Sequence, residues 1–212
     1  MGKIHPIFST SSAAAAAATA SPSRDVTSTT ETFTMWMKSL VMNGNGCTIY
    51  DQNGAVVYRV DNYQKKGGRE VCLMDLKGNL VFTILRTASL LLCPFLSRTW
   101  KGYRRDEETA SFSVARRTKR LFATGLCCEV VSCDGRYKME ASSGGKLTAF
   151  KITDVVSGGV VAEAKRKQST STAGRRGVLL GSDVLTLVVR PGVDRSLVLG
   201  LATVYGLMSR RL

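Results

Sequence analysis

The hydrophobic pattern of the last thirty residues predicts one buried strand followed by one buried helix. Residues 184–189 form a run of β-branched and leucine side chains with the length of a strand. Pro191 and Gly192 end this run, and Asp194 follows where the N-cap of a helix is expected. From Ser196 to Met208 apolar residues occur on all sides of the predicted helix, so we expect it to be buried all round.

The same apolar segment could also be interpreted as a membrane-spanning helix. A spanning helix needs about 20 apolar residues, whereas this run is shorter and is bracketed by Asp194–Arg195 and Arg210–Arg211. We therefore interpret it as a core helix, with the two last arginines complementing the negative pole of the helix dipole. Its side chains contribute about 1.5–3 kcal/mol each only when they are buried, so the rest of the chain must enclose it.

The chain before this helix consists of short strand-like runs separated by turn signals. Loops that begin with Asp and contain Gly, at 51–54, 75–79 and 134–135, and a glycine-rich loop at 157–159, each lie between two such runs. The predicted strands are 33–42, 47–50, 55–60, 71–74, 80–85, 97–104, 111–116, 126–133, 136–139, 147–152, 160–164 and 184–189. The apolar residues 88–96 are interrupted by Pro94, and the pattern does not place them.

This arrangement of strands predicts the fold class. Many strands leave unpaired edges, and closure into a barrel removes them. A barrel of about twelve strands is too wide for its own side chains to fill, and the terminal helix is the apolar segment that can fill it. The sequence therefore predicts a mainly β protein, a closed β-barrel enclosing a central hydrophobic C-terminal α-helix. We assign residues 1–32, with their polyalanine run, to a disordered low-complexity tail and residues 33–212 to the barrel domain.

Composition then limits the chemistry. The 212-residue chain has a net charge of +14, which favours anionic partners such as nucleic acid, lipid headgroups or acidic proteins. The single histidine, His5, lies in the tail and there is no CxxC pair, so we expect no catalytic residue, no metal site and no cofactor. The six cysteines lie mostly in apolar runs, and we interpret them as buried free thiols.

Clusters of basic residues are the main candidates for a binding surface. Each Lys or Arg near an anionic membrane contributes about 1 kcal/mol. The candidate lipid- or phosphate-binding residues are Arg116, Arg117, Lys119, Arg120, Lys101, Arg104 and Arg105. The alternative interpretation is that these are solvated strand ends that keep the barrel soluble. Trp100 and Tyr103 are interleaved with the second group, which would also suit stacking on single-stranded nucleic acid.

Several motifs, in order along the chain, resemble the plant LURP-one-related family. They are WMKSLVMNGNGC at 36–47, YRVDNY at 58–63, LMDLKG at 73–78, LR at 85–86, KGY at 101–103, and DVLTLVV with PGVD between 183 and 194. The resemblance covers about residues 33–212. It implies the Tubby-like C-terminal fold, a twelve-stranded barrel around a central helix that phospholipid scramblases share, and a link to plant defence. Tubby domains bind phosphatidylinositol bisphosphate and can act as membrane-tethered regulators, but fold alone does not transfer that function.

We therefore expect a non-enzymatic regulatory domain of plant defence signalling whose basic surface binds phosphoinositide or membrane surfaces. Two alternatives remain open: a protein-interaction module that uses residues 88–96 and 165–181, and a nucleic-acid-binding transcription regulator. Protein partners are expected in addition to anionic phospholipid headgroups. We expect a monomer without a transmembrane span, located in the cytoplasm, peripherally at the plasma membrane, or in the nucleus.

Overall fold

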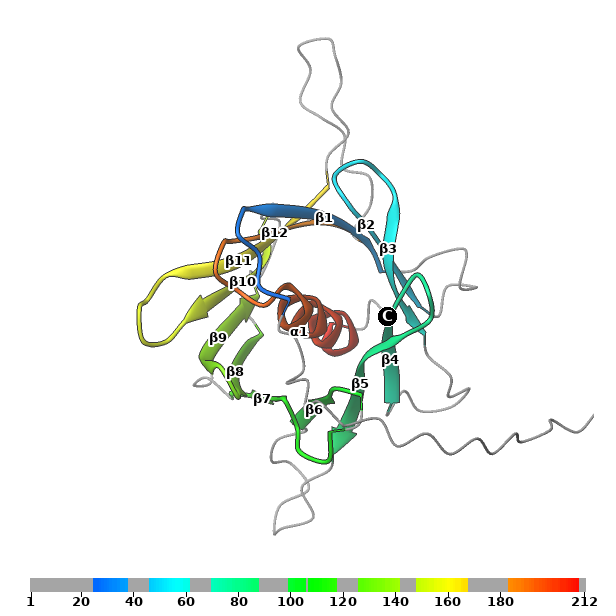
Figure 1. Cartoon of the computed structure of the whole chain (residues 1–212). Coiled ribbons are helices and arrows are strands. Elements are labelled where there is room, and N and C mark those ends of the chain that lie inside the picture. Colours follow the sequence, from blue (N-terminus) through cyan, green and yellow to red (C-terminus); the bar gives the residue numbers. More distant parts are fainter. Residues whose placement is uncertain are drawn as a thin grey trace, which may run out of the picture.

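A closed barrel of antiparallel strands surrounds one helix in the computed structural model (Figure 1). The structure describes residues 25–37, 46–61, 70–87, 99–105, 107–117, 126–141, 148–167 and 183–209. The elements are β1 (Glu31–Trp36), β2 (Cys47–Tyr50), β3 (Val56–Asp61), β4 (Glu70–Asp75), β5 (Leu80–Thr87), β6 (Thr99–Tyr103), β7 (Phe112–Arg116), β8 (Cys127–Ser132), β9 (Gly135–Ala141), β10 (Thr148–Asp154), β11 (Val160–Arg166), β12 (Val184–Val189) and α1 (Arg195–Met208). The predicted fold class is confirmed.

Strand pairing follows the order of the chain, and β1 closes the barrel by pairing with both β2 and β12. In β12 the side chains of Leu185, Leu187 and Val189 are fully buried, whereas those between them are only partly buried. Because Phe33 of β1 lies opposite Leu187, the apolar rows of neighbouring strands continue around the interior. The run 184–189 is thus the expected strand, but only one of its faces is buried because the other face is the outer wall.

The helix α1 fills the barrel, as the sequence predicted. Its residues from Ser196 to Gly206 are all buried. Close packing depends on two glycines: a Cβ atom at Gly102 would lie 2.1 Å from the ring of Phe112, and one at Gly200 would lie 3.0 Å from the same ring. The Phe112 ring in turn packs edge-on against Phe82, with 5.2 Å between the ring centroids. Larger side chains at either glycine would push this aromatic pair out of place.

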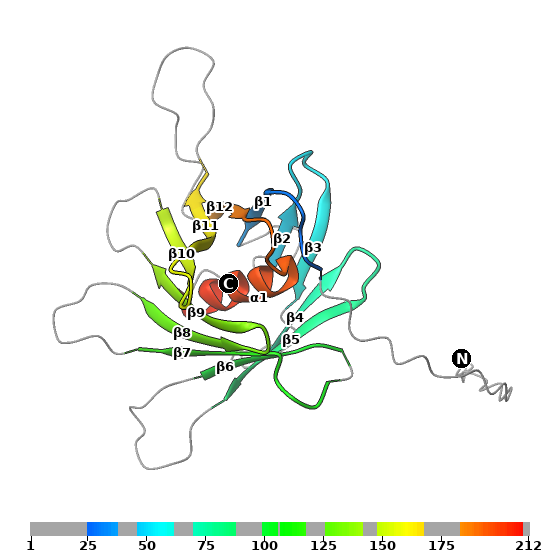
Figure 2. The same ribbon diagram turned by 60° about the vertical axis from the view of Figure 1, so that its left-hand side comes forward.

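The barrel has two distinct ends because successive strands alternate in direction. The start end holds the turns 51–55, 76–79, 104–111, 133–134 and 155–159 and the residues 190–194 that lead into α1. Figure 2 shows the β2–β3 and β4–β5 turns on the same side as the orange first turn of α1. At the opposite exit end β1 finishes and β12 begins. Met208, the last residue of α1, lies there with its Sδ 3.6 Å from the Cys128 Sγ of β8.

Some sequence-based boundaries need correction. The sequence predicts a tail up to residue 32, but the structure places residues 25–27 against the start of α1 and begins β1 at Glu31. Residues 1–24 lie outside the described residues, as do 88–96 and the second half of the predicted strand 33–42, residues 38–42. The predicted strand 97–104 is shorter, at Thr99–Tyr103.

The cysteines are only partly as expected. Five lie in the described residues and all five are free thiols. Cys47, Cys127 and Cys128 are buried, as predicted, and Cys72 is half-buried. Cys133 is exposed, because it belongs to the turn between β8 and β9 rather than to a strand interior. Cys93 lies outside the described residues.

Candidate functional site

The basic candidates are divided between the two ends of the barrel. Arg116 is the last residue of β7 and Arg117 follows it, so both are exposed at the exit end. Lys101 lies on the outer face of β6, since its neighbours Trp100 and Gly102 are buried. The other β6 candidates, at positions 104 and 105, follow the strand at the start end. Those at 119 and 120 lie outside the described residues, in the segment that connects β7 to β8.

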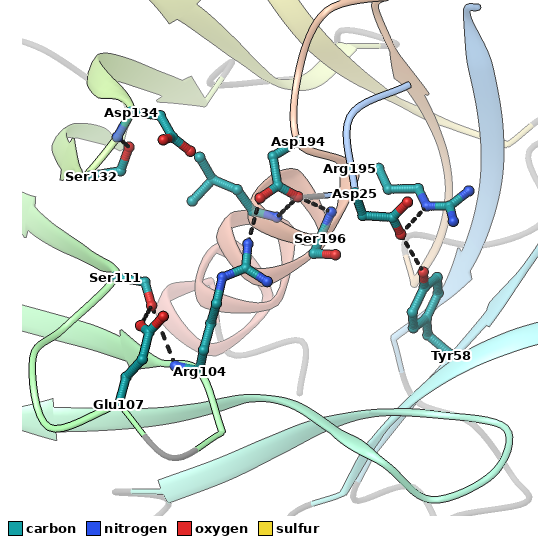
Figure 3. Close-up of polar contacts among 11 residues, drawn as sticks. Asp25, Tyr58, Arg104, Glu107, Ser111, Ser132, Asp134, Asp194, Arg195 and Ser196 are labelled. Atoms are coloured by element: carbon teal, nitrogen blue, oxygen red, sulfur yellow. Dashed lines mark hydrogen bonds and ion pairs between the residues drawn. The ribbon is translucent and has the colours of Figure 1, made fainter. Parts of the chain in front are cut away.

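Arg104 is engaged inside the start end of the barrel. Its guanidinium forms an ion pair with Asp194, and the two side chains are only 16 % and 3 % exposed (Figure 3). The same guanidinium lies over the ring of Phe82, 4.7 Å from its centroid. An arginine with these partners is not available to a lipid phosphate, so we do not carry Arg104 into the proposed binding surface.

Asp194 links the helix to the barrel wall through its two carboxylate oxygens. Oδ1 accepts hydrogen bonds from the backbone N–H groups of Ser196 (2.9 Å) and Leu197 (3.3 Å), which is the N-cap that the sequence predicted. Oδ2 pairs with Arg104, which the sequence did not reveal because the two residues are 90 positions apart. The Asp194 carboxylate therefore caps the N-terminus of α1 and links it by an ion pair to Arg104 at the end of β6.

A short N-terminal segment, which we call the strap (Asp25–Thr27), closes over the start of α1. Backbone hydrogen bonds join the Arg195 N–H to the Asp25 carbonyl (3.0 Å) and the Gly192 N–H to the Thr27 carbonyl (2.8 Å). The Arg195 guanidinium also pairs with the carboxylates of Asp25 and, at 3.1 Å, Glu31. The sequence did not predict this role of the strap, because its partners, Gly192 and Arg195, lie far along the chain.

The strap also changes the titration of its partners. The Tyr58 hydroxyl donates to Asp25 (3.4 Å), and burial raises the pKa of Tyr58, with a smaller contribution from the Asp25 charge and an opposing one from Arg195. Burial alone would lower the pKa of Arg195, but its hydrogen bond to Asp25 and the charges of Asp25 and Glu31 raise that pKa overall. Arg195 is thus held in its charged form at neutral pH.

Charges on the outer wall largely pair with one another. Arg117 contacts Glu129 (2.8 Å) and Lys138 contacts Glu140 (2.9 Å), with all four side chains substantially exposed. Exposed pairs of this kind contribute about 0–1 kcal/mol each. The described residues contain 16 of the 30 Lys and Arg and 15 of the 16 Asp and Glu, so their positive and negative charges nearly cancel.

The excess positive charge therefore belongs to the remaining segments, and chain connectivity assigns most of it to one end. Each segment that connects two strands at the exit end contains at least one basic residue, as do residues 210–212 after α1, and Asp183, just before β12, is the one acidic residue in these segments. Outside the described residues, these segments contain 12 basic residues: Lys38, Lys65, Lys66, Arg69, Arg98, Lys119, Arg120, Lys146, Arg175, Arg176, Arg210 and Arg211. In a closed antiparallel barrel every second connection lies at the same end. The concentration of basic residues at one end could therefore have been predicted from the sequence by comparing the odd-numbered connections with the even-numbered ones.

Arginines also stand on the inner side of the wall at the exit end. Arg116 lies opposite the buried Cys128, and Arg86 lies over the buried ring of Trp100, 5.8 Å from its centroid. Arg166 ends β11, and its Nε is buried without a hydrogen-bond partner. These cations surround the end at which α1 finishes, where the helix dipole is negative. They add positive charge to the end that already carries the basic connections.

Other kinds of site find no support in the part of the chain that the structure describes. No three His, Cys, Asp or Glu side chains there are grouped as a metal site would require. The helix α1, at 14 residues, is too short to cross a membrane, and no other helix occurs in the described ranges. A groove of about 500 Å³ does open at the start end, lined by residues 29–33, the β2–β3 and β4–β5 turns and Arg195.

The architecture defines a class, a closed antiparallel barrel threaded by its own C-terminal helix. A solved X-ray structure of an Arabidopsis thaliana protein has this fold, with a TM-score of 0.56 over 87 % of this chain and 94 % of that one, at 17 % identity. The chain belongs to the LURP-one-related family, whose model matches residues 31–206. It is 38 % identical to Protein LURP-one-related 11 of Arabidopsis thaliana, across 99 % of this chain and 89 % of that protein. Protein LURP-one-related 4 of the same plant is 39 % identical over 84 % of this chain and 78 % of its own length.

Proposed function

We propose that this protein is a non-enzymatic regulatory domain that binds anionic membrane surfaces, phosphoinositides in particular, through the exit end of its barrel. The observation that carries the proposal is the segregation of charge. Outside the described residues, the segments joined to this end contain 12 Lys and Arg and no Asp or Glu, with Asp183 as the one acidic residue in their described parts, whereas the described body as a whole is nearly balanced. Many cations in segments joined to one end of a barrel suit an extended anionic surface better than they suit a small ligand.

The magnitude of this attraction is sufficient for peripheral binding. At about 1 kcal/mol for each Lys or Arg near an anionic bilayer, six engaged cations would give about 6 kcal/mol before orientational costs. Binding of this kind weakens as salt rises, because the Debye length falls to about 8 Å at physiological ionic strength. The exit end is also where α1 finishes, so docking there leaves the strap and the turns of the start end facing solution.

Liposome co-sedimentation with matched charge variants tests the proposal. In one variant Arg116, Arg117, Lys119 and Arg120 are changed to Gln, which removes four charges from the exit end. In its control Lys77, Arg105, Arg136 and Arg190, all exposed at the start end, are changed to Gln. Both variants have the same net charge, so they separate the position of the charge from its total.

We expect binding to vesicles that contain phosphatidylinositol bisphosphate or phosphatidylserine, and little binding to phosphatidylcholine alone. The exit-end variant should bind about tenfold more weakly or worse, and the control should bind like the natural protein. Negligible binding to all vesicles at moderate salt, or equal losses in the two variants, would refute the proposal. Binding to single-stranded nucleic acid in preference to the anionic vesicles would favour the alternative of a nucleic-acid partner instead.

The setting that we propose is plant defence signalling, which the resemblance to the family implied. In that setting the domain would hold a signalling partner at a membrane and release it when the lipid composition changes. Loss of the exit-end charges should then move a fluorescently tagged protein away from the plasma membrane of plant cells. A tagged exit-end variant that keeps its membrane location would contradict this part of the proposal.

A further inference from the structure

The large hydrophobic side chains that are exposed in the described residues all lie at the start end of the barrel. They are Val26, Leu76, Val131, Val155, Val156 and Val160. Val26 belongs to the strap and Leu76 to the β4–β5 turn. Val155 and Val156 lie in the β10–β11 turn, Val160 begins β11, and Val131 is near the end of β8. Singly exposed apolar residues need no explanation, but one that stands beside a groove can belong to an interaction face.

Leu76 differs from the others because it lines the groove of about 500 Å³ at the start end. Its side chain is 63 % exposed, and Phe33, Val57 and Tyr58 provide further apolar lining. Thr29 and the neighbouring residues up to 32 form one wall, and the β2–β3 and β4–β5 turns form the other. The groove thus combines an apolar lining with open access, which suits a projecting side chain of another protein.

Carboxylates dominate the charge around this groove. Asp51 and Asp75 each begin a turn that lines it, and each accepts backbone hydrogen bonds from its own turn, such as the 2.8 Å bond from the Asn79 N–H to Asp75. Hydrogen bonding from the Asn79 side chain holds the pKa of Asp75 below its ordinary value. The Arg195 guanidinium in the lining is already paired with Asp25 and Glu31. Lys77 also lines the groove, so its lining holds three carboxylates (Glu31, Asp51 and Asp75) against two cations (Lys77 and Arg195). The remaining excess of negative charge favours a cationic partner.

We propose that this groove, which we name the Leu76 groove, is a docking site for a partner protein that presents an apolar side chain next to Lys or Arg in an extended segment. The apolar side chain contacts Val57, Tyr58 and Leu76, and the cation pairs with Asp51 or Asp75. An anionic membrane is a poor occupant, because the same carboxylates would face its headgroups. The inference goes beyond lipid binding, since it concerns the opposite end of the barrel and holds whether or not the exit end binds a membrane.

The test uses random peptides displayed for selection against the full-length protein, followed by fluorescence anisotropy with the selected peptide made synthetically. The groove variant is Asp75→Asn with Leu76→Ser. Its control is Asp154→Asn with Val156→Ser in the β10–β11 turn, where Asp154 likewise accepts backbone hydrogen bonds and the Val156 side chain is 90 % exposed. Asn keeps an oxygen acceptor for the turn in both cases, so the two variants differ chiefly in whether the groove is altered.

We expect selected peptides to share an apolar residue beside Lys or Arg. Their affinity should fall about tenfold in the groove variant and stay within about twofold in the control. No shared pattern, an acidic pattern, or equal losses in the two variants would overturn the proposal. If the groove variant does not fold, amide chemical shifts of the natural protein decide: peptide addition must move the signals of Leu76 and Lys77, and movement confined to Val155 and Val156 overturns it as well.

Discussion

We expect the buried ion pair between Arg104 and Asp194 to make the main electrostatic contribution to the packing of α1 against the barrel wall. Changing Arg104 to Met keeps an unbranched side chain over Phe82 but leaves a carboxylate that is only 3 % exposed without its cation. Removing one partner of a buried pair costs about 3–5 kcal/mol. Asp194 still accepts hydrogen bonds from two backbone N–H groups, and these reduce the cost. We therefore expect a loss of about 2–4 kcal/mol in the free energy of unfolding.

The reciprocal change, Asp194→Asn, should cost a similar amount for a different reason. Asn can still cap α1, because its side-chain oxygen replaces Oδ1. The loss then comes from Arg104, whose side chain is only 16 % exposed and whose ion pair with a carboxylate is the one to Asp194. At about 2–4 °C per kcal/mol for a domain of this size, each single variant should melt about 5–15 °C lower.

A double-mutant cycle measured by urea unfolding, followed by tryptophan fluorescence and circular dichroism, isolates the pair. The double variant should be more stable than the sum of the two single losses allows, by about 1–3 kcal/mol of coupling free energy. The exposed pair Arg117–Glu129, changed to Gln on both sides, serves as the control and should change stability by less than about 1 kcal/mol. Strictly additive losses, or single losses no larger than that control, would refute the structural role assigned to Arg104.

Three further outcomes are expected. A maleimide should label the exposed Cys133 of the native protein within minutes and leave Cys128 unlabelled until urea is added, because burial raises the pKa of Cys128 to about 12; mass spectrometry of digested samples checks this. Gly102→Ala should lower the free energy of unfolding by about 1–3 kcal/mol or more in urea melts, because the added methyl overlaps the ring of Phe112. The carboxyl signal of Asp75 should titrate in NMR below the ordinary Asp range; since its folded pKa is depressed, its stabilising contribution is present above that range and is lost as pH falls through the folded value.

Some parts of the fold were determined by local sequence. The helix and its cap were predictable because Asp194 and the apolar run after it are adjacent in the chain, and capping requires only neighbouring backbone groups. The hairpins were predictable for the same reason: the loops that begin at Asp51 and Asp75 place a glycine with φ of +81° at Gly54 and Gly78, a conformation that glycine adopts readily. Closure into a barrel followed from the number of strands and the need to enclose the helix.

The candidate site depended on the tertiary structure. Composition gave the charge but not its position, so Arg104 and Arg116 seemed equivalent in sequence although one is paired inside the start end and the other is exposed at the exit end. The sequence places the strap in the tail because the partner of Asp25, Arg195, lies 170 residues later in the chain. Only closure of the barrel brings the two side chains together.

What the sequence by itself determined is therefore the set of elements, their order and the filling of the barrel by α1, since alternation, turns and caps are encoded over a few neighbouring residues. Only the tertiary structure decided which charges are neutralised and which groove the turns enclose. Ion pairs and cavities join residues that are distant in the chain, and strand register together with closure brings them within a few ångströms of one another.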